Sequence, residues 1–167
     1  DGRNLVDEWK AGAPNRTAVI DRAGFNAFNW NSDGQIFGLF EPSHMQYELD
    51  RAKDGKGEPS IAEMTKSAIT RLSRNANGYV LMVEGGRVDH GLHAGDAQRA
   101  LGDAAALDEA IAAAVAATDP KDTLIIVTAD HSHTLILQGY PQRGNPILGL
   151  VKENDKLVKA LDGKPYT

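Results

Sequence analysis

The chain alternates between short apolar runs and longer stretches in which apolar residues recur every three or four positions. Short runs rich in β-branched residues and bounded by turn residues are typical of buried strands. Four such runs predict strands at residues 17–20, 36–40, 79–83 and 123–128. Two further runs, residues 134–138 and 147–151, suit a pair of short strands or a loop. The charged, glycine-containing stretch 51–58 predicts an exposed loop.

The clearest local helix is predicted at residues 60–75. Pro59 precedes it, and Ser60 with Glu63 makes a capping box, in which each side chain accepts a hydrogen bond from the other residue's backbone N–H. The apolar face of this helix consists of Ile61, Met64, Ala68 and Leu72. A shorter helix is predicted around residues 5–9.

An alanine-rich stretch, residues 96–118, predicts a long amphipathic helix between the strands at 79–83 and 123–128. Its apolar stripe is formed by Leu101, Ala104, Leu107, Ile111 and Val115. A strand–helix–strand crossover makes the two strands parallel, so both end at the same edge of a sheet. The predicted class is α/β, with a mainly parallel sheet and helices on both faces.

Acidic and histidine side chains follow both of these strands. They are Glu84, Asp89 and His93 after the first, and Asp130, His131 and His133 after the second. Gly85 and Gly86 let the backbone turn sharply after Glu84. Asp89 and His93, four residues apart, share one face of a helical turn. Ligands of open α/β sheets gather beyond the carboxyl ends of strands, so we expect both groups to face one cleft.

Oxygen and nitrogen donors without sulfur suit Zn²⁺, and the chain has no cysteine. The lone carboxylate of Glu84 suits a harder ion such as Mg²⁺. Two zinc ions about 3.5–4 Å apart can clamp both oxygens of a phosphoryl displacement. Each residue also has a simpler interpretation. Glu84 suits a carboxylate at a helix start, and Asp89 with His93 suits an exposed helix pair. Asp130 suits a strand-end cap and His131 a surface histidine.

The other histidines are expected to play lesser parts. His133, two residues beyond His131, can hydrogen-bond a ligating carboxylate without binding metal itself. We expect His90 to be a neighbour of the site and His44 to be a surface residue. A formal charge of -5 gives no electrostatic reason to expect nucleic acid or an anionic membrane as a partner. No apolar run is long enough to span a membrane, and no signal peptide opens the chain.

Two motifs carry a resemblance to a known family. V-E-G-G-R-V-D-H-G-L-H at residues 83–93 and V-T-A-D-H-S-H at 127–133 resemble the alkaline phosphatase family, nearest to its animal and marine-bacterial members. Residues 1–9, 38–42, 63–75 and 139–149 resemble further segments of that family in the same order. Sulfatases, nucleotide pyrophosphatases and cofactor-independent phosphoglycerate mutases share the wider superfamily. We do not expect them to share the E-G-G-R and G-Y-x-x-R-G-N stretches.

The resemblance implies a phosphate monoester hydrolase with two Zn²⁺ and one Mg²⁺, acting through a phosphoserine. It implies that Asp89 and His93 bind the first zinc, Asp130 and His131 the second, and Glu84 the magnesium. His133 resembles a histidine that steadies an aspartate of the first zinc site. Phe40, Glu41 and Glu58 fall near a calcium site of some animal enzymes. The loop there differs in length, and the family usually has Asp where Glu58 stands.

Several family residues have no counterpart in this chain. The nucleophilic serine, the phosphate-binding arginine and an aspartate bridging zinc and magnesium precede the matching part, and a third zinc-binding histidine follows it. Ser132 belongs to the D-H-S-H run and does not replace the serine. The chain also begins without Met. We therefore expect residues 1–167 to be one internal segment of an alkaline-phosphatase-like domain, inactive alone.

The expected partners are the remainder of the same enzyme, a phosphate monoester and, in the family manner, a second copy of the protein. The resemblance implies a periplasmic or extracellular location. Two other readings stay open: a non-catalytic metal-binding or structural fragment of a nicked enzyme, and a superfamily relative acting on diesters or sulfate esters.

Overall fold

The longest element, α6 (Ala97–Ala117), is the helix against which three other helices pack. The computed structural model describes residues 2–135, 140–159, 161, 163 and 165. Asp96 caps α6 by accepting a hydrogen bond from the backbone N–H of Arg99. The buried positions of α6 are alanines, namely Ala100, Ala106 and Ala110. Small side chains let neighbouring helices approach closely, and α4 (Ile61–Leu72) and α5 (Arg87–His93) both pack there.

The predicted helix at 60–75 is confirmed as α4. Both hydrogen bonds of the capping box between Ser60 and Glu63 are present. The helix buries Thr65 and Ile69. A short helix, α3 (Glu48–Arg51), also contacts α6.

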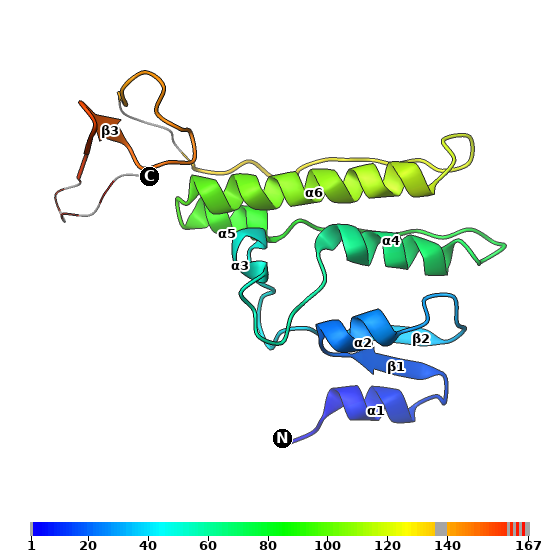
Figure 1. Ribbon diagram of the computed structural model, residues 1–167. Coiled ribbons are helices and arrows are strands. Elements are labelled where there is room, and N and C mark those ends of the chain that lie inside the picture. Colours follow the sequence, from blue (N-terminus) through cyan, green and yellow to red (C-terminus); the bar gives the residue numbers. More distant parts are fainter. Residues whose placement is uncertain (1, 136–139, 160, 162, 164, 166–167) are drawn as a thin grey trace.

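The N-terminal part contains a small parallel sheet. Strands β1 (Arg16–Val19) and β2 (Gln35–Gly38) pair in parallel. Each begins one residue before its predicted strand, and β2 ends two residues earlier than predicted. Helix α1 (Leu5–Ala11) lies on one side of this sheet and α2 (Arg22–Ala27) on the other (Figure 1). Sequence reasoning missed α2, although Asp21 is an N-cap whose carboxylate accepts the backbone N–H of Gly24.

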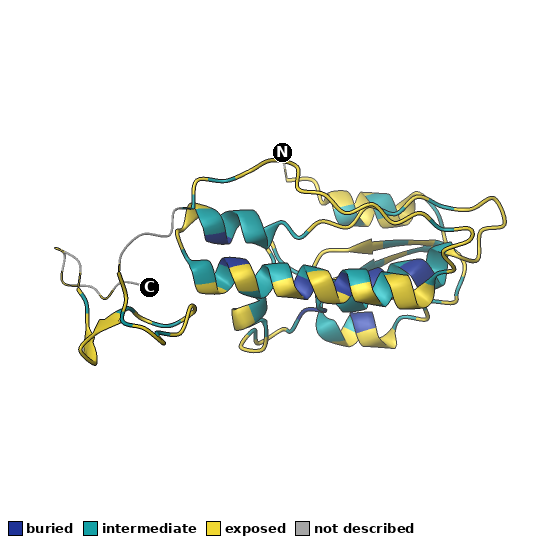
Figure 2. Cartoon of the chain, turned by 90° about the horizontal axis from the view of Figure 1, so that it is seen from above, coloured by how far each residue is buried: buried dark blue, intermediate teal, exposed yellow. Residues whose placement is uncertain are grey.

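The other two predicted strands differ from expectation. Within the described residues, neither 79–83 nor 123–128 forms a β-ladder; both run lengthwise beside the helices (Figure 1). The side chains of Val80 and Met82 are 96% and 84% exposed, and those of Leu124 and Ile126 are 82% and 77% exposed. Both stretches are thus apolar but largely uncovered (Figure 2). The predicted central sheet through them is not observed, because no ladder partner lies beside them in the described part.

The C-terminal part forms a small hairpin. Strands β3 (Lys152–Glu153) and β4 (Lys156–Leu157) pair antiparallel around Asn154 and Asp155, which both have positive φ. Residues 147–151 form a loop, while residues 136–138 of the other predicted apolar run lie outside the described residues. No described helix is both long and apolar enough to cross a membrane.

Candidate metal centre

The first half of the centre is built on α5. The chain reaches α5 through Gly85, where a Cβ would lie 3.1 Å from the Leu107 side chain, so a larger residue would push this turn away from α6. Asp89 lies in the first turn of α5 and His93 in the last. Their side chains meet on one face, with His93 Nε2 3.5 Å from Asp89 Oδ2.

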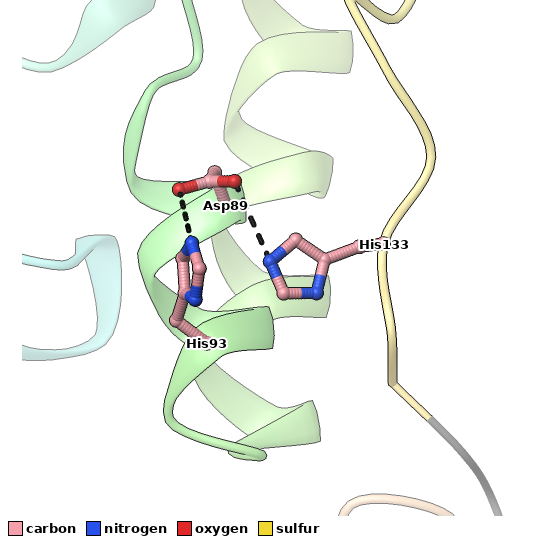
Figure 3. Close-up of side chains that lie close together, drawn as sticks. All are labelled: Asp89, His93 and His133. Carbon is pink, nitrogen blue, oxygen red and sulfur yellow. Dashed lines mark ion pairs between the residues drawn. The ribbon is translucent and has the colours of Figure 1, made fainter.

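The second half comes from the stretch that follows residues 123–128. His131 Nε2 and His133 Nε2 lie 3.7 Å and 3.5 Å from Asp89 Oδ1. His131 Nε2 is also 3.4 Å from Asp130 Oδ2. Figure 3 shows Asp89 between His93 and His133. Three of the predicted histidines are therefore gathered around the carboxylate of Asp89, and Asp130 reaches the group through His131.

The tightest group consists of Asp89, His93 and His133, each of which offers a ligand atom within 4.8 Å of the others. The rings of His93 and His133 meet edge to face, with centroids 4.5 Å apart. His133 is 11% exposed and His93 is 70% exposed, so the group is open to solvent on the His93 side. Such a group suits a cation that a further ligand or substrate can approach.

Glu84 does not join this group among the described residues. Its side chain is exposed and folds back toward the start of α5, where Oε1 would lie 3.4 Å from a Cβ placed on Gly86. This position also fits the simpler interpretation of a helix-start carboxylate.

Backbone partners give His131 and His133 opposite hydrogen-bonding roles. His131 Nδ1 lies 2.8 Å from the carbonyl oxygen of Ser132, which only accepts, so Nδ1 carries the hydrogen. The Nε2 lone pair of neutral His131 then faces Asp89 and Asp130. In His133, Nδ1 accepts a hydrogen bond from the backbone N–H of Thr134 at 2.8 Å. Its Nε2 therefore carries the hydrogen and points it toward Asp89.

The charge state of His131 follows from the same contacts. The hydrogen bond to the Ser132 carbonyl, and then the charges of Asp130 and Asp89, raise the pKa of His131. A cation at Nε2 must displace this proton, so metal binding here competes with protonation.

His90 lies beside the centre on α5, as expected. Arg87 Nη1 donates to His90 Nδ1 at 3.0 Å, because a guanidinium has no acceptor. Burial, with the charges of His44 and Arg87, lowers the pKa of His90, so the ring is held neutral. His44 is exposed, as predicted, and its ring lies 4.3 Å from that of His90.

A second group consists of carboxylates alone: Glu41, Asp54 and Glu58. Glu58 is only 3% exposed, which makes the prediction of an exposed loop at 51–58 wrong at this residue. Its Oε1 accepts the backbone N–H of Gln46 at 2.7 Å, while its Oε2 is buried without a hydrogen-bond partner among the described residues. Burial raises the pKa of Glu58, and the charges of Asp54 and Glu41 raise it further.

Sequence reasoning named Phe40, Glu41 and Glu58 here but missed Asp54. Two signals were available: Asp54 stands four residues before Glu58, and the charged loop between them contains two glycines. Phe40 is half-buried and its ring packs edge-on against Phe25.

The chain is similar to known proteins along its whole length. A sequence model of the alkaline phosphatase family matches residues 1–166. The tissue-nonspecific alkaline phosphatase of Felis catus is 44% identical over 176 residues, covering 100% of this chain and 31% of its own length. An alkaline phosphatase of Gadus morhua is 41% identical over 169 residues, covering 100% of this chain and 34% of its own length.

Solved structures agree in fold. The Thermus thermophilus alkaline phosphatase superposes with a TM-score of 0.61 and 34% identity, over 70% of this chain and 24% of that one. The cold-active enzyme of a Shewanella species gives a TM-score of 0.56 at 23% identity, over 66% and 25%. The chain thus spans about a third of the length of the curated relatives named above.

Proposed function

Because the chain belongs to the alkaline phosphatase family, we propose that it supplies part of the metal centre of a phosphate monoester hydrolase. The observation that carries the proposal is the meeting of two sequence-distant segments around Asp89. Helical packing fixes one segment, and the other runs beside it. A shared cation explains why three imidazoles gather at one carboxylate.

The donor set fits zinc. Imidazole nitrogens and carboxylate oxygens are its ordinary ligands when sulfur is absent. In this proposal Asp89 and His93 hold one zinc, and Asp130 and His131 hold a second. Zinc supplies a Lewis acid that polarises the phosphate ester and eases ionisation of the attacking hydroxyl. The attacking group is a serine outside this chain, and the reaction passes through a phosphoserine.

His131 and His133 divide the work according to their backbone partners. His131 presents an Nε2 lone pair, so it serves as a ligand. His133 presents Nε2–H toward Asp89 Oδ1, so it orients that carboxylate and keeps its other oxygen turned toward His93. Partners of this kind fix ligand direction in metal sites.

Two further cation sites belong to the proposal. Glu84 supplies a magnesium ligand, in company with residues outside this chain. Glu41, Asp54 and Glu58 hold a hard divalent cation such as Ca²⁺, which prefers oxygen ligands. The buried, unpartnered Oε2 of Glu58 supports the second of these, because a cation would satisfy an atom that otherwise has no partner.

The remainder of the protein is the proposed partner of the uncovered apolar stretches. Val80 and Met82, and likewise Leu124 and Ile126, are more exposed than the residues beside them, as in a strand whose one sheet face is left open. We propose that residues 1–167 are an internal segment of one domain, whose other strands cover this face. A homodimer and a periplasmic or extracellular location complete the proposal by family likeness.

The purified chain provides the first test. With Zn²⁺ and Mg²⁺ added, it should bind zinc in calorimetry but show no turnover of a chromogenic phosphate monoester at alkaline pH. Turnover typical of alkaline phosphatases would refute the proposed division of labour, and absence of zinc binding would refute the metal centre.

The full-length gene product provides the second test, because it contains the residues that the chain lacks. It should hydrolyse phosphate monoesters in preference to diesters or sulfate esters. A preference for either of the latter would place the protein among superfamily relatives with other substrates. Failure to cleave any of them would favour a non-catalytic metal-binding role.

A further inference from the structure

Tyr47, at the start of α3, is in contact with two arginines that belong to different helices. The guanidinium carbon of Arg87, from α5, is 3.7 Å from the centroid of the Tyr47 ring. That of Arg99, from α6, is 4.9 Å from the same centroid. The negative face of an aromatic ring attracts cations, so one ring attracts both helices.

Arg99 fixes the position of this ring relative to α6. Its guanidinium donates to Asp50 Oδ2 from Nε at 3.2 Å and from Nη2 at 3.1 Å. Its Nη1 donates to Asp96 at 3.2 Å. The backbone N–H of Glu48 donates to Asp103 Oδ2 of α6, also at 3.2 Å. The residues that follow Tyr47 are therefore held to α6 from two sides.

Arg87 depends on the ring more than Arg99 does. Its Nη1 bonds to His90 within α5, and its Nε is buried with no acceptor among the described residues. A contact within the same helix cannot fix that helix relative to its neighbours. The ring of Tyr47, from another element, lies against the Arg87 guanidinium, and Asp103 of α6 acts on Arg87 through its charge.

Helix α5 is short and packs mainly on one neighbour, α6. It has seven residues, and its N-cap, Gly86, makes no side-chain hydrogen bond. At its middle, Gly91 packs on α6 so closely that a Cβ would lie 2.7 Å from Ala100 N. That contact fixes the distance between the helices. The N-terminal end of α5 is held by Gly85 against Leu107 of α6 and by Arg87 against Tyr47 of α3, and of these two contacts the second ties α5 to an element other than α6.

We propose that Tyr47 is a positioning residue for the metal centre: its ring, in contact with both Arg87 and Arg99, helps to set the orientation of α5 and thus of Asp89 and His93. This inference rests on the proposed metal-binding role of those two residues. On this proposal the Arg87–Tyr47–Arg99 stack does more than pack α3 against its neighbours, because it also raises the affinity of the metal centre.

Cobalt titration of the purified chain tests the inference, because Co²⁺ reports ligand geometry in its visible absorption. Tyr47→Leu removes the aromatic face but keeps an apolar side chain, whereas Tyr47→Phe keeps the face. We expect Tyr47→Leu to weaken Co²⁺ binding about tenfold, as loss of a ligand-orienting partner typically does. Its spectrum should lose intensity, and Tyr47→Phe should match the wild-type chain in both affinity and spectrum.

Ile69→Val is the matched control for a purely structural effect. Ile69 is 5% exposed on α4 and has no part in the stack. At a temperature where each variant is folded by circular dichroism, Ile69→Val should bind Co²⁺ like the wild-type chain. Equal weakening by Ile69→Val, or unchanged binding by Tyr47→Leu, would overturn the positioning role alone.

Arg87→Gln approaches the same stack from the other side and remains informative if Tyr47→Leu does not fold. It should weaken Co²⁺ binding like Tyr47→Leu, and wild-type affinity in this variant would again overturn the positioning role. Failure of the wild-type chain itself to bind Co²⁺ would instead overturn the metal centre on which the inference stands.

Discussion

The two candidate cation sites of this chain differ in donors, in burial and in how they are built. The site around Asp89 mixes imidazoles with carboxylates and is open on the side of His93. The site of Glu41, Asp54 and Glu58 holds only carboxylates, one of them almost fully buried. Mixed nitrogen and oxygen donors favour zinc, and oxygen donors alone favour calcium. The comparison shows that the two groups present different donor atoms and therefore suit cations of different hardness.

The construction of the sites differs as well. The first depends on a helix and a neighbouring segment whose side chains carry their own hydrogen-bonded partners, such as Ser132 for His131 and Thr134 for His133. The second depends on a loop that buries a carboxylate and leaves Oε2 unsatisfied. The first should therefore tolerate an absent cation better than the second.

The largest effect is expected at the shared carboxylate. Asp89→Asn keeps the size of the side chain but removes the charge that faces His93, His131 and His133. Zinc affinity, measured by calorimetry, should fall by more than the roughly 10–100-fold typical of losing an orienting partner. Asp108→Asn, an exposed carboxylate of α6, is the matched control and should leave the affinity unchanged. Zinc affinity of Asp89→Asn equal to that of the control would show that the carboxylate is not a ligand.

The next effect, on zinc affinity, distinguishes His131, whose backbone partner is a carbonyl, from His133, whose backbone partner is an N–H. His133→Gln should lower zinc affinity about tenfold, because Asp89 loses an orienting partner. His131→Gln should lower it further, because a ligand is removed. It should also weaken the pH dependence of binding, since the proton that competes at His131 is gone. Titrations at two pH values check both points, and a steeper loss for His133→Gln would reverse the assigned roles.

The difference between the sites also explains which of their features could be predicted from the sequence. The proximity of Asp89 and His93 was predictable because a helical turn alone brings positions four apart together. The approach of His131 was predictable because it follows an apolar run expected to end at the same edge. The capping box of α4 was predictable for the same reason: Ser60 and Glu63 interact locally. The hydrogen-bonding roles of His131 and His133 were not predictable, because they depend on backbone atoms placed by the fold.

Asp54 and the burial of Glu58 were missed for a different reason. The carboxylate of Glu58 is buried because the loop folds onto the backbone N–H of Gln46, twelve residues earlier. Charge and glycine content describe the loop in isolation, where exposure is the natural expectation. The stretches 79–83 and 123–128 show the same limit. An apolar run predicts that a sheet partner exists, but it does not predict that the partner lies within the described residues.

The third effect tests the carboxylate site through stability. The folded-state pKa of Glu58 is raised above the ordinary value of 4.5, so the folded protein holds this proton more tightly than the unfolded chain. Stability from this group is therefore lost as pH rises from about 4.5 through the folded-state value. Glu58→Gln removes that loss. In EDTA at neutral pH its Tm should exceed that of the wild-type chain.

Calcium should reverse this order. A cation that binds the folded state alone stabilises it, by about 2.7 kcal/mol at 100 times its Kd. Added Ca²⁺ should thus raise the Tm of the wild-type chain but not that of Glu58→Gln. A Tm that Ca²⁺ leaves unchanged in both proteins would argue against a cation at this site.

The smallest effect concerns Glu63, whose two carboxylate oxygens both have a partner, unlike the Oε2 of Glu58. Arg22 donates from both Nη atoms to the two carboxylate oxygens of Glu63, each at 2.6 Å. This contact, with the hydrogen bond from the backbone N–H of Ser60, lowers the pKa of Glu63 to about 2. The backbone N–H of Arg22 also donates to the carbonyl of Gly57, so the pair ties α4 to the residue just before Glu58.

Because the folded-state pKa of Glu63 lies below its ordinary value of 4.5, the folded protein binds this proton more weakly than the unfolded chain. The stabilisation is present above pH 4.5 and is lost as pH falls toward about 2. Urea titrations of the wild-type chain should therefore show a fall in unfolding free energy across this window that Glu63→Gln lacks. The fall should be modest, since the side chain of Glu63 is 40% exposed and solvent screens the pair. Identical pH profiles would mean that the pair does not anchor the loop, and that the burial of Glu58 depends on Gln46 alone.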